Sequence, residues 1–299
     1  MTNRVSSFEM SNMSLYYIDQ ATSRMDTAQQ QMASGYSINA PSDNPVGIGQ
    51  VLDFSQQNLQ LGQFSSNIQS ALGSLTTTSS ALSSLTNIVQ TARSLAVAGA
   101  NDTLNSQARL ALSAQVGDIV NQAVSIANTK YGDRYIFAGQ EIYNAPITLG
   151  TSGYQYNGGT NAAGTGEIHV EIGINSSVVT NVTADTAILP IVQTLQQLQT
   201  DLQGGTSSAI SNIDLANIDK QLTNLEDTSG QVGATMQQLQ AAQQSTTLQQ
   251  ADLTTVSSQI QDANMPQVAI ALQTAQTAYQ AALKVTSSSF QNTLLNYLP

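Results

Sequence analysis

An apolar residue recurs at every seventh position of the stretch "FSQQNLQLGQFSSNIQSALGSLTTTSSALSSLTNIVQTARSLA" (residues 54–96). Such a heptad seam is typical of a long helix that packs lengthwise against other helices. In the following "AGANDTLN", Gly99 and Asn101 can take the left-handed conformation that ends a helix, so we predict a helix end near residue 100. The members of the seam are Phe54, Leu61, Ile68, Leu75, Leu82, Val89 and Ala96.

The stretch "SGYSINAPSDNPVGIG" (residues 34–49) interrupts the helical pattern just before this long helix. Pro45 fixes one backbone angle, the glycines permit tight ones, and Asp43 or Asn44 can cap the next helix. The break therefore separates the long helix from a preceding amphipathic helix. The apolar stripe of that first helix consists of Ile18, Ala21, Met25, Ala28 and Met32.

The second half of the chain mirrors the first. A helix is predicted over residues 112–126, and then short aromatic or β-branched runs separated by Gly, Asn and Pro predict strands between residues 131 and 185. Helical periodicity returns after Asp185, and a long helix from about Asp214 carries a second coiled-coil-like seam. That seam consists of Leu239, Ala242, Thr246, Gln249, Leu253, Val256, Ile260 and Ala263.

A last amphipathic helix follows the break "DANMPQ" (residues 262–267), with a stripe of Val268, Leu272, Ala275, Tyr279 and Ala282. This order predicts a mainly α fold with a β-rich insert. The N- and C-terminal parts form an elongated antiparallel helical bundle, a coiled coil with a small β domain at its far end. We expect three domains: a terminal helical assembly domain (residues 1–43 and 264–299), a helical rod domain (44–130 and 186–263) and a β-rich inserted domain (131–185).

The stripes of the two terminal helices are rich in Ala, Met and Thr. Side chains this small cannot close a self-sufficient core when only two helices pair. We therefore expect other molecules to cover these stripes, together with the apolar end of the chain. The residues expected at such contacts are Ile18, Met25, Met32, Val268, Leu272, Tyr279, Phe290, Leu294, Leu295 and Leu298.

The composition excludes several kinds of partner and chemistry. A net charge of -11, with only 8 Lys and Arg scattered singly, predicts no binding to nucleic acid and no basic membrane-binding patch. No apolar run is long enough to cross a bilayer, so no membrane insertion is expected, and the N-terminal stretch does not have the pattern of a cleaved signal peptide. Zero cysteines exclude disulfides and thiolate metal sites.

A search for an active site finds no candidate for a catalytic, cofactor-binding or metal-binding residue. His169 is the single histidine and lies in a strand pattern, where an ordinary strand histidine is the better interpretation. A secreted enzyme would need a carboxylate pair in the insert, but Glu167 and Glu171 share a strand face with nothing to shift their acidity. The sequence therefore predicts a protein that is not an enzyme and has no cofactor.

Three motifs, in the right order, resemble the bacterial flagellin family over about two thirds of the chain. "QTARSLAVAGAN" (residues 90–101) is similar to the end of the family's first long helix, with Arg93 at the place of the family's arginine. "DANMPQVAIALQTAQTAYQAALKV" and the apolar ending are similar to its C-terminal helix, whereas Ser37 stands where members commonly carry a basic residue. "MASGYSINAPSDNPVG" (residues 32–47) resembles the family turn at Ser34, Gly35, Ile38, Asn39, Asp43, Asn44, Pro45 and Gly47.

The resemblance implies a structural subunit of the bacterial flagellum, secreted without a cleaved signal peptide by the flagellar export apparatus. "DRYIFAGQ" (residues 133–140) resembles members that form the junction between hook and filament, while the alternative is a flagellin that builds the filament itself. The implied partners are copies of the chain in a ring, the adjacent hook-associated junction protein, flagellin and an export chaperone. A cytosolic coiled-coil scaffold is the alternative from another class.

Overall fold

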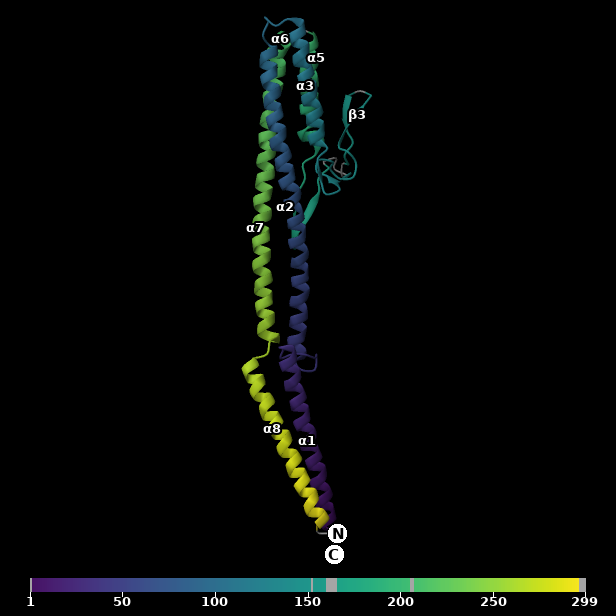
Figure 1. Cartoon of the computed structure of the whole chain (residues 1–299), viewed down its shortest axis with the longest axis vertical. Coiled ribbons are helices and arrows are strands. Elements are labelled where there is room, and N and C mark those ends of the chain that lie inside the picture. The colour runs from purple at the N-terminus through teal and green to yellow at the C-terminus, as the bar shows by residue number, and fades with distance from the viewer. Residues whose placement is uncertain (1, 152, 160–165, 205–206, 296–299) are drawn as a thin grey trace. The chain divides into compact units, whose positions relative to one another are not determined.

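The computed structural model describes residues 2–151, 153–159, 166–204 and 207–295. The chain divides into two compact units (Figure 1). Unit 1 comprises residues 1–60 and 249–299, and unit 2 comprises residues 61–248. Two long helices, α2 (Pro45–Gly99) and α7 (Leu215–Gln261), contribute to both units.

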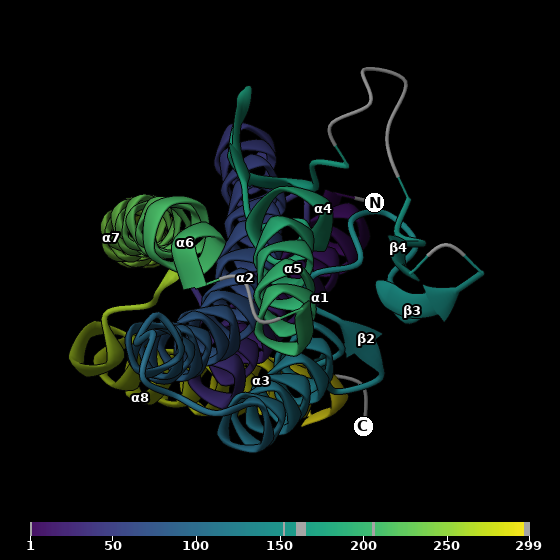
Figure 2. The ribbon, with the colours of Figure 1, turned by 90° about the horizontal axis from the view of Figure 1, so that it is seen from above.

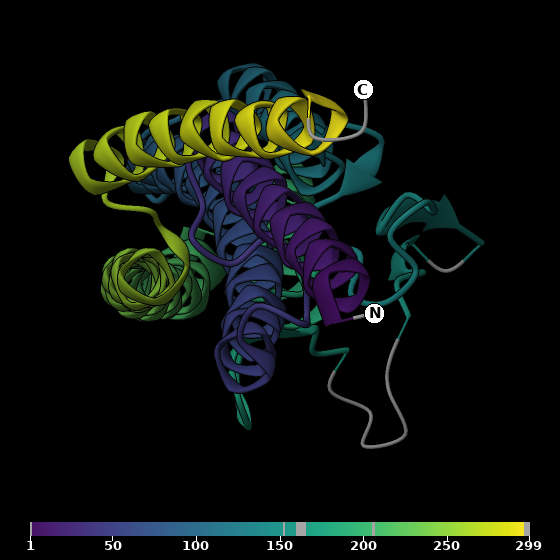
Figure 3. The same cartoon turned by 90° about the horizontal axis from the view of Figure 1, so that it is seen from below.

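Unit 1 pairs the first helix, α1 (Thr2–Ser34), with the last, α8 (Met265–Leu295). Figures 1 and 3 show the two helices side by side. Their apolar stripes face each other, as expected for a chain whose two ends meet. Among the side chains that the structure describes on these helices, those buried between them are few and mostly small, namely Ala21, Ala28, Val268, Ala275 and Thr286.

Unit 2 is a helical bundle around one continuous core (Figure 2). It joins the larger parts of α2 and α7 to α3 (Ser106–Ala127) and α5 (Leu189–Gly204). The heptad prediction for α2 is confirmed, because from Ile68 to Ala96 each member of the seam is buried. The core of α7 follows a seven-residue repeat too, which starts earlier than the predicted seam and consists of Ile218, Leu225, Val232, Leu239 and Thr246.

The predicted seam of α7 is wrong at two of its later positions. Gln249 and Val256 are exposed, and Val256 keeps 40% of its surface open to solvent. In this last part of α7, Leu253 faces Phe54 of α2 within unit 1 across a small cavity of about 270 Å³. Contact with α2 covers one flank of this part of α7, so Gln249 and Val256 on the other flank stay exposed.

The α2 helix ends at Gly99, near residue 100 as predicted, but the expected left-handed conformation is wrong, since neither Gly99 nor Asn101 has a positive φ. Gly99 is needed for packing instead, because a β-carbon there would collide with the side chain of Leu202 on α5. Asn101 turns the chain with its side chain, whose Oδ1 accepts a hydrogen bond from Thr103 N at 3.1 Å. The helix therefore ends in an Asx turn.

The described residues of the insert form three antiparallel hairpins. They are β1 (Lys130–Tyr131) with β2 (Arg134–Tyr135), β3 (Ile147–Gly150) with β4 (Gly153–Tyr156), and β5 (His169–Gly173) with β6 (Ser176–Val179). The first hairpin pairs Tyr131 with Arg134, the second Ile147 with Tyr156, and the third His169 with Val179.

The run "RYIFAGQ" (residues 134–140) lies where the sequence predicts strands, but only its first two residues form one. The rest turns inward, because Phe137 and Ala138 are fully buried and Phe137 O accepts a hydrogen bond from Ala184 N at 2.9 Å. Ala184 begins the short helix α4 (Ala184–Ala187). This segment therefore anchors the insert to the bundle.

A short helical link leads from α5 into α7. It contains α6 (Ser207–Ala209) and a π-helical turn (Ile210–Asp214). The structure confirms the predicted fold class, a mainly α protein with a β-rich insert. The three domain boundaries stay a prediction.

Candidate assembly surfaces

The turn between α1 and α2 is closed by the side chain of Asp43. Its Oδ2 accepts hydrogen bonds from the backbone N–H groups of Asn39 and Ala40, both at 2.9 Å. These bonds, that from Ala40 first, lower the pKa of Asp43 below its ordinary value, because they favour the charged form. The Asn39 side chain holds the other side of the turn by donating to Tyr36 O at 2.9 Å.

The sequence left open whether Asp43 or Asn44 caps α2. The cap is Asn44, whose Oδ1 accepts from Gly47 N at 2.9 Å, and Pro45 occupies the first helical position. Gly47 leaves room for this cap, since a β-carbon there would collide with the Asn44 side chain. Gly35 has a φ of +77°, so it supplies the left-handed residue that ends α1.

The turn is hydrogen-bonded to the break between α7 and α8, which sequence reasoning missed. Ser37 N and Ser37 Oγ both donate to Gln261 O, at 2.7 and 3.0 Å. On the other side, Ala263 N donates to Gly35 O at 2.8 Å, and a β-bridge joins Tyr36 to Asp262. The only signal in the sequence for this contact was indirect. One break follows α1 and the other precedes α8, and these two helices were expected to pair.

The predicted contact residues of the terminal helices lie on the faces where α1 and α8 meet. Ser34 lies at the end of α1, where its Oγ accepts from Tyr36 N at 3.1 Å. Val268 is buried. Five others are only half-buried, so the partner helix leaves part of each uncovered: Ile18, Met25, Met32, Leu272 and Tyr279.

A groove of about 680 Å³ runs between α1 and α8, with Ala21 and Arg24 on one side and Ala275 and Ala278 on the other. Large apolar side chains that the sequence reading did not single out stand exposed on the same two helices. Tyr16 and Tyr17 touch edge to face at 5.9 Å between ring centres. The exposed set is Met13, Leu15, Tyr16, Tyr17, Met265, Ile270, Leu283 and Val285.

The apolar ending was also predicted to make contacts. The side chains of Phe290, Leu294 and Leu295 lie outside the described part of the structure, as does the whole of Leu298. Their role in assembly stays a prediction from the sequence.

Arg93 joins α2 to α7 in unit 2. Its Nε lies 2.6 Å from Oδ1 of Asp219, and Nη2 donates to Oδ2 at 3.4 Å. The hydrogen bond from Arg93 lowers the pKa of Asp219. Both side chains are about half exposed, so the pair links the helices at the surface rather than in the core.

Acid–base chemistry has little support among the described residues. No group of three or more His, Cys, Asp or Glu side chains among them could hold a metal ion. In that same part of the chain no helix has the length and apolar character needed to cross a membrane. Burial, followed by the charge of Asp201 and a hydrogen bond to it, raises the pKa of Asp214 to about 6. Asp214 has no exposed surface, so it is no site for a substrate.

Two family descriptions match the helical ends of the chain. The bacterial flagellin N-terminal helical region matches residues 5–141, and the bacterial flagellin C-terminal helical region matches residues 215–298. The chain belongs to the bacterial flagellin family. The resemblance predicted from the turn and helix motifs is thereby confirmed.

Relatives within the flagellin family have two kinds of name. The flagellar hook-associated protein 3 of Salmonella typhimurium is 33% identical over 126 residues, which are 42% of this chain and 40% of that protein. A flagellin of Listeria monocytogenes is 30% identical over 113 residues, 38% of this chain and 39% of the other. The chain thus matches about two fifths of the length of these curated relatives.

Solved structures share the fold at lower identity. The Bacillus cereus protein FlgL is 22% identical with a TM-score of 0.56, covering 68% of this chain and 97% of that one. The flagellar junction protein FlgL of Legionella pneumophila is 17% identical with a TM-score of 0.58, covering 73% of this chain and 100% of the other.

Proposed function

We propose that the chain is a structural subunit of the bacterial flagellum that forms the junction between hook and filament. The observation that carries the proposal is the thinly covered pair of α1 and α8. Of the side chains described on these helices, few are buried between them and most of those are small, while tyrosines and aliphatic side chains stay exposed. Because the two flagellin regions include these helices, subunit contacts there are the natural use of the surface.

A position at the junction is favoured over the filament by the relatives and by the segment "DRYIFAGQ". The partners of this proposal are copies of the chain in a ring, the adjacent hook-associated junction protein, flagellin, an export chaperone and the flagellar secretion apparatus. Under this proposal, the protein reaches the outside of the cell without a cleaved signal peptide and acts without catalysis.

The proposal is tested by locating the protein on intact flagella with a labelled antibody. We expect a single band where the hook meets the filament. Label along the whole filament would instead identify a filament subunit, and absence from sheared flagella would favour the cytosolic scaffold.

A filament subunit is the second candidate, because a Listeria flagellin is also a relative at 30% identity. Purified protein added to filament fragments separates the two. A filament subunit should elongate the seeds, and a junction protein should leave their length unchanged.

The assembly surface is tested by charging an exposed apolar residue of α8. Ile270 is 68% exposed, so Ile270→Asp should leave the fold intact but stop incorporation into flagella. Leu149→Asp is the matched control, because Leu149 in β3 is 71% exposed. Cells with the Ile270 variant should release flagellin into the medium and swim poorly, while normal filaments would contradict the assigned surface.

A further inference from the structure

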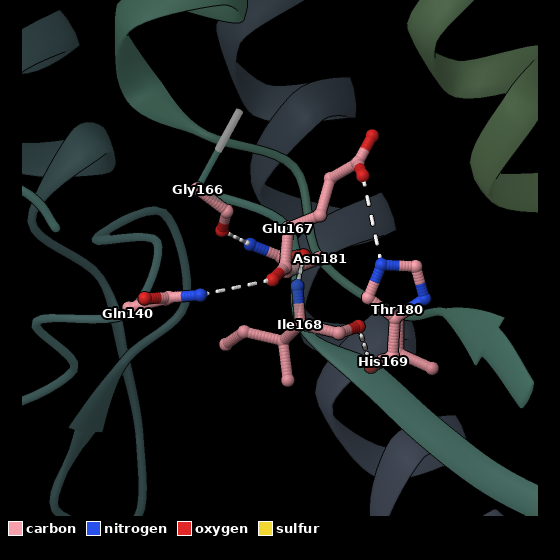
Figure 4. Close-up of polar contacts among 7 residues, drawn as sticks. All are labelled: Gln140, Gly166, Glu167, Ile168, His169, Thr180 and Asn181. Carbon is pink, nitrogen blue, oxygen red and sulfur yellow. Dashed lines mark hydrogen bonds and ion pairs between the residues drawn. The ribbon is translucent and has the colours of Figure 1, made fainter. Parts of the chain in front are cut away.

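A cavity in unit 2 lies beside the insert. It measures about 1000 Å³, within the range of small-molecule sites. Its floor is the stretch of α2 from Asn67 to Ser74, one wall is formed by residues 131–143, and the other by residues 167–170 at the start of β5. Figure 4 shows the polar contacts at the second wall.

The lining differs sharply from the rest of the surface. Three of the ten tyrosines of the chain, Tyr131, Tyr135 and Tyr143, line the cavity together with its single histidine. Aromatic residues make up only 5% of the chain, so this concentration separates the cavity from an incidental surface depression. Tyr143 is 69% exposed and Tyr131 44%, which leaves ring surface available to a ligand.

The tyrosine wall is held in place by neighbouring residues. Gly73 of α2 lets Tyr131 lie directly against the helix, because a β-carbon at position 73 would collide with the ring and its hydroxyl. The Lys130 ammonium lies 4.5 Å from the ring centre of Tyr135, on one face of that ring. Two of the three rings are therefore positioned before any ligand arrives.

The opposite wall is unsuited to a peptide that would add a strand to β5. Gln140 Nε2 donates to Glu167 O at 3.5 Å, and Asn67 Nδ2 donates to Glu171 O at 3.1 Å. Side-chain amides thus occupy two of the carbonyl groups that an added strand would need. A ligand in this cavity would therefore be recognised by side chains rather than by the backbone of β5.

Those side chains offer hydrogen bonds without a strong charge. Asp133 and Arg134 are exposed at the hairpin turn, and among the described residues neither side chain makes an ion pair. His169 Nε2 lies 3.6 Å from Glu167 Oε2, so these two side chains contact each other (Figure 4). The formal charges of Asp133, Arg134 and Glu167 sum to -1, which favours neither nucleic acid nor an anionic ligand.

We propose that this cavity binds an uncharged oligosaccharide. The apolar C–H face of a sugar ring would pack on the tyrosines, and adjacent hydroxyl groups would bond to the carboxylate of Asp133 and the guanidinium of Arg134, which present paired acceptors and donors. A lipid would need a far more apolar lining. This inference does not depend on the flagellar role proposed above.

The test is calorimetric titration of the full chain with neutral tri- and tetrasaccharides of glucose, mannose, galactose and N-acetylglucosamine, with a hyaluronan tetrasaccharide as the acidic comparison. At least one neutral sugar should bind saturably. Asp133→Ala and Tyr143→Ala should each weaken that binding at least about tenfold, which corresponds to roughly 1.4 kcal/mol.

Asp227→Ala is the matched control, since Asp227 is an exposed residue of α7 outside the cavity, and it should bind as the parent does. Circular dichroism of each variant checks that the fold is kept. The proposal is overturned if no neutral sugar binds at millimolar concentration, if only the acidic sugar binds, or if the Asp133 and Tyr143 variants bind as tightly as the parent.

Discussion

The α1–α8 pair and the bundle of unit 2 are both built from amphipathic helices, yet their cores differ in kind. In the bundle, the buried seam positions are mostly Ile, Leu and Val, with Ala96 and Thr246, whereas the described side chains buried in the pair are mainly Ala, with Val268 and Thr286. A fully buried Leu or Ile contributes about 1.5–3 kcal/mol, and Ala contributes far less. The same periodicity thus produces a core of large side chains in one region and a core of mainly small ones among the described residues of the other.

The strongest test of this contrast is a charge in the core of the bundle. Leu82 has no exposed surface, so Leu82→Asp would bury an unpaired carboxylate and should lower the free energy of unfolding by on the order of 4 kcal/mol. Leu59→Asp, at a position of α2 that is 75% exposed, is the control and should change it little. Equal urea midpoints for the Leu82 variant and the parent would refute the assigned seam.

A pH experiment probes a weak point at the end of the bundle. Neither carboxylate oxygen of Asp214 meets a donor among the described residues, and the neighbouring Asp201 carboxylate can only accept, so the protonated form of Asp214 is favoured. Its pKa of about 6 lies above the ordinary 3.8. The contribution of protonated Asp214 to the stability of the fold is therefore complete below about pH 4, and it is lost as the pH rises through 6.

Asp214→Asn removes this titration while keeping the shape of the side chain. At pH 7.5 the variant should be more stable than the parent by up to about 3 kcal/mol, and the difference should vanish near pH 4. Thermal unfolding measured across this range checks it. A difference that does not change with pH would show that Asp214 is not kept neutral by its surroundings.

Matched valines compare the two regions directly. Val232 in the bundle is 3% exposed and Val268 in the pair is 7% exposed. Val232→Ala should lower the stability of the bundle by about 1–2 kcal/mol, whereas Val268→Ala should leave the bundle's unfolding transition unchanged. Hydrogen exchange should instead quicken in α1 and α8 of the Val268 variant. Identical exchange patterns for both variants would remove the distinction between the regions.

The smallest expected effect concerns the surface of the bundle. Arg93→Ala breaks the ion pair with Asp219, and because both side chains are half exposed the loss should be no more than about 1 kcal/mol. The loss should shrink further in high salt, as screening weakens the pair in the parent too. A larger loss that persists in salt would mean that Arg93 packs rather than pairs.

Sequence reasoning succeeded where a pattern is local. The heptad of α2, the stripes of α1 and α8 and the short strands of the insert follow from side-chain periodicity. It placed the end of α2 correctly but failed on the role of Gly99, which has no left-handed conformation and instead leaves room for the side chain of Leu202 from α5. The prediction that Val256 belongs to the α7 seam failed for a similar reason, because periodicity does not tell how many helices surround a seam.

The sequence by itself determined the long helices, the break between α1 and α2, and the difference between large and small seam residues. Helix geometry turns these into faces without reference to distant residues. Only the tertiary structure decided that Ser37 bonds to Gln261, that Asp214 is buried near Asp201, and that three tyrosines share a cavity with His169. Ser37 and Gln261 are 224 residues apart, so their contact depends on how packed helices bring remote segments together.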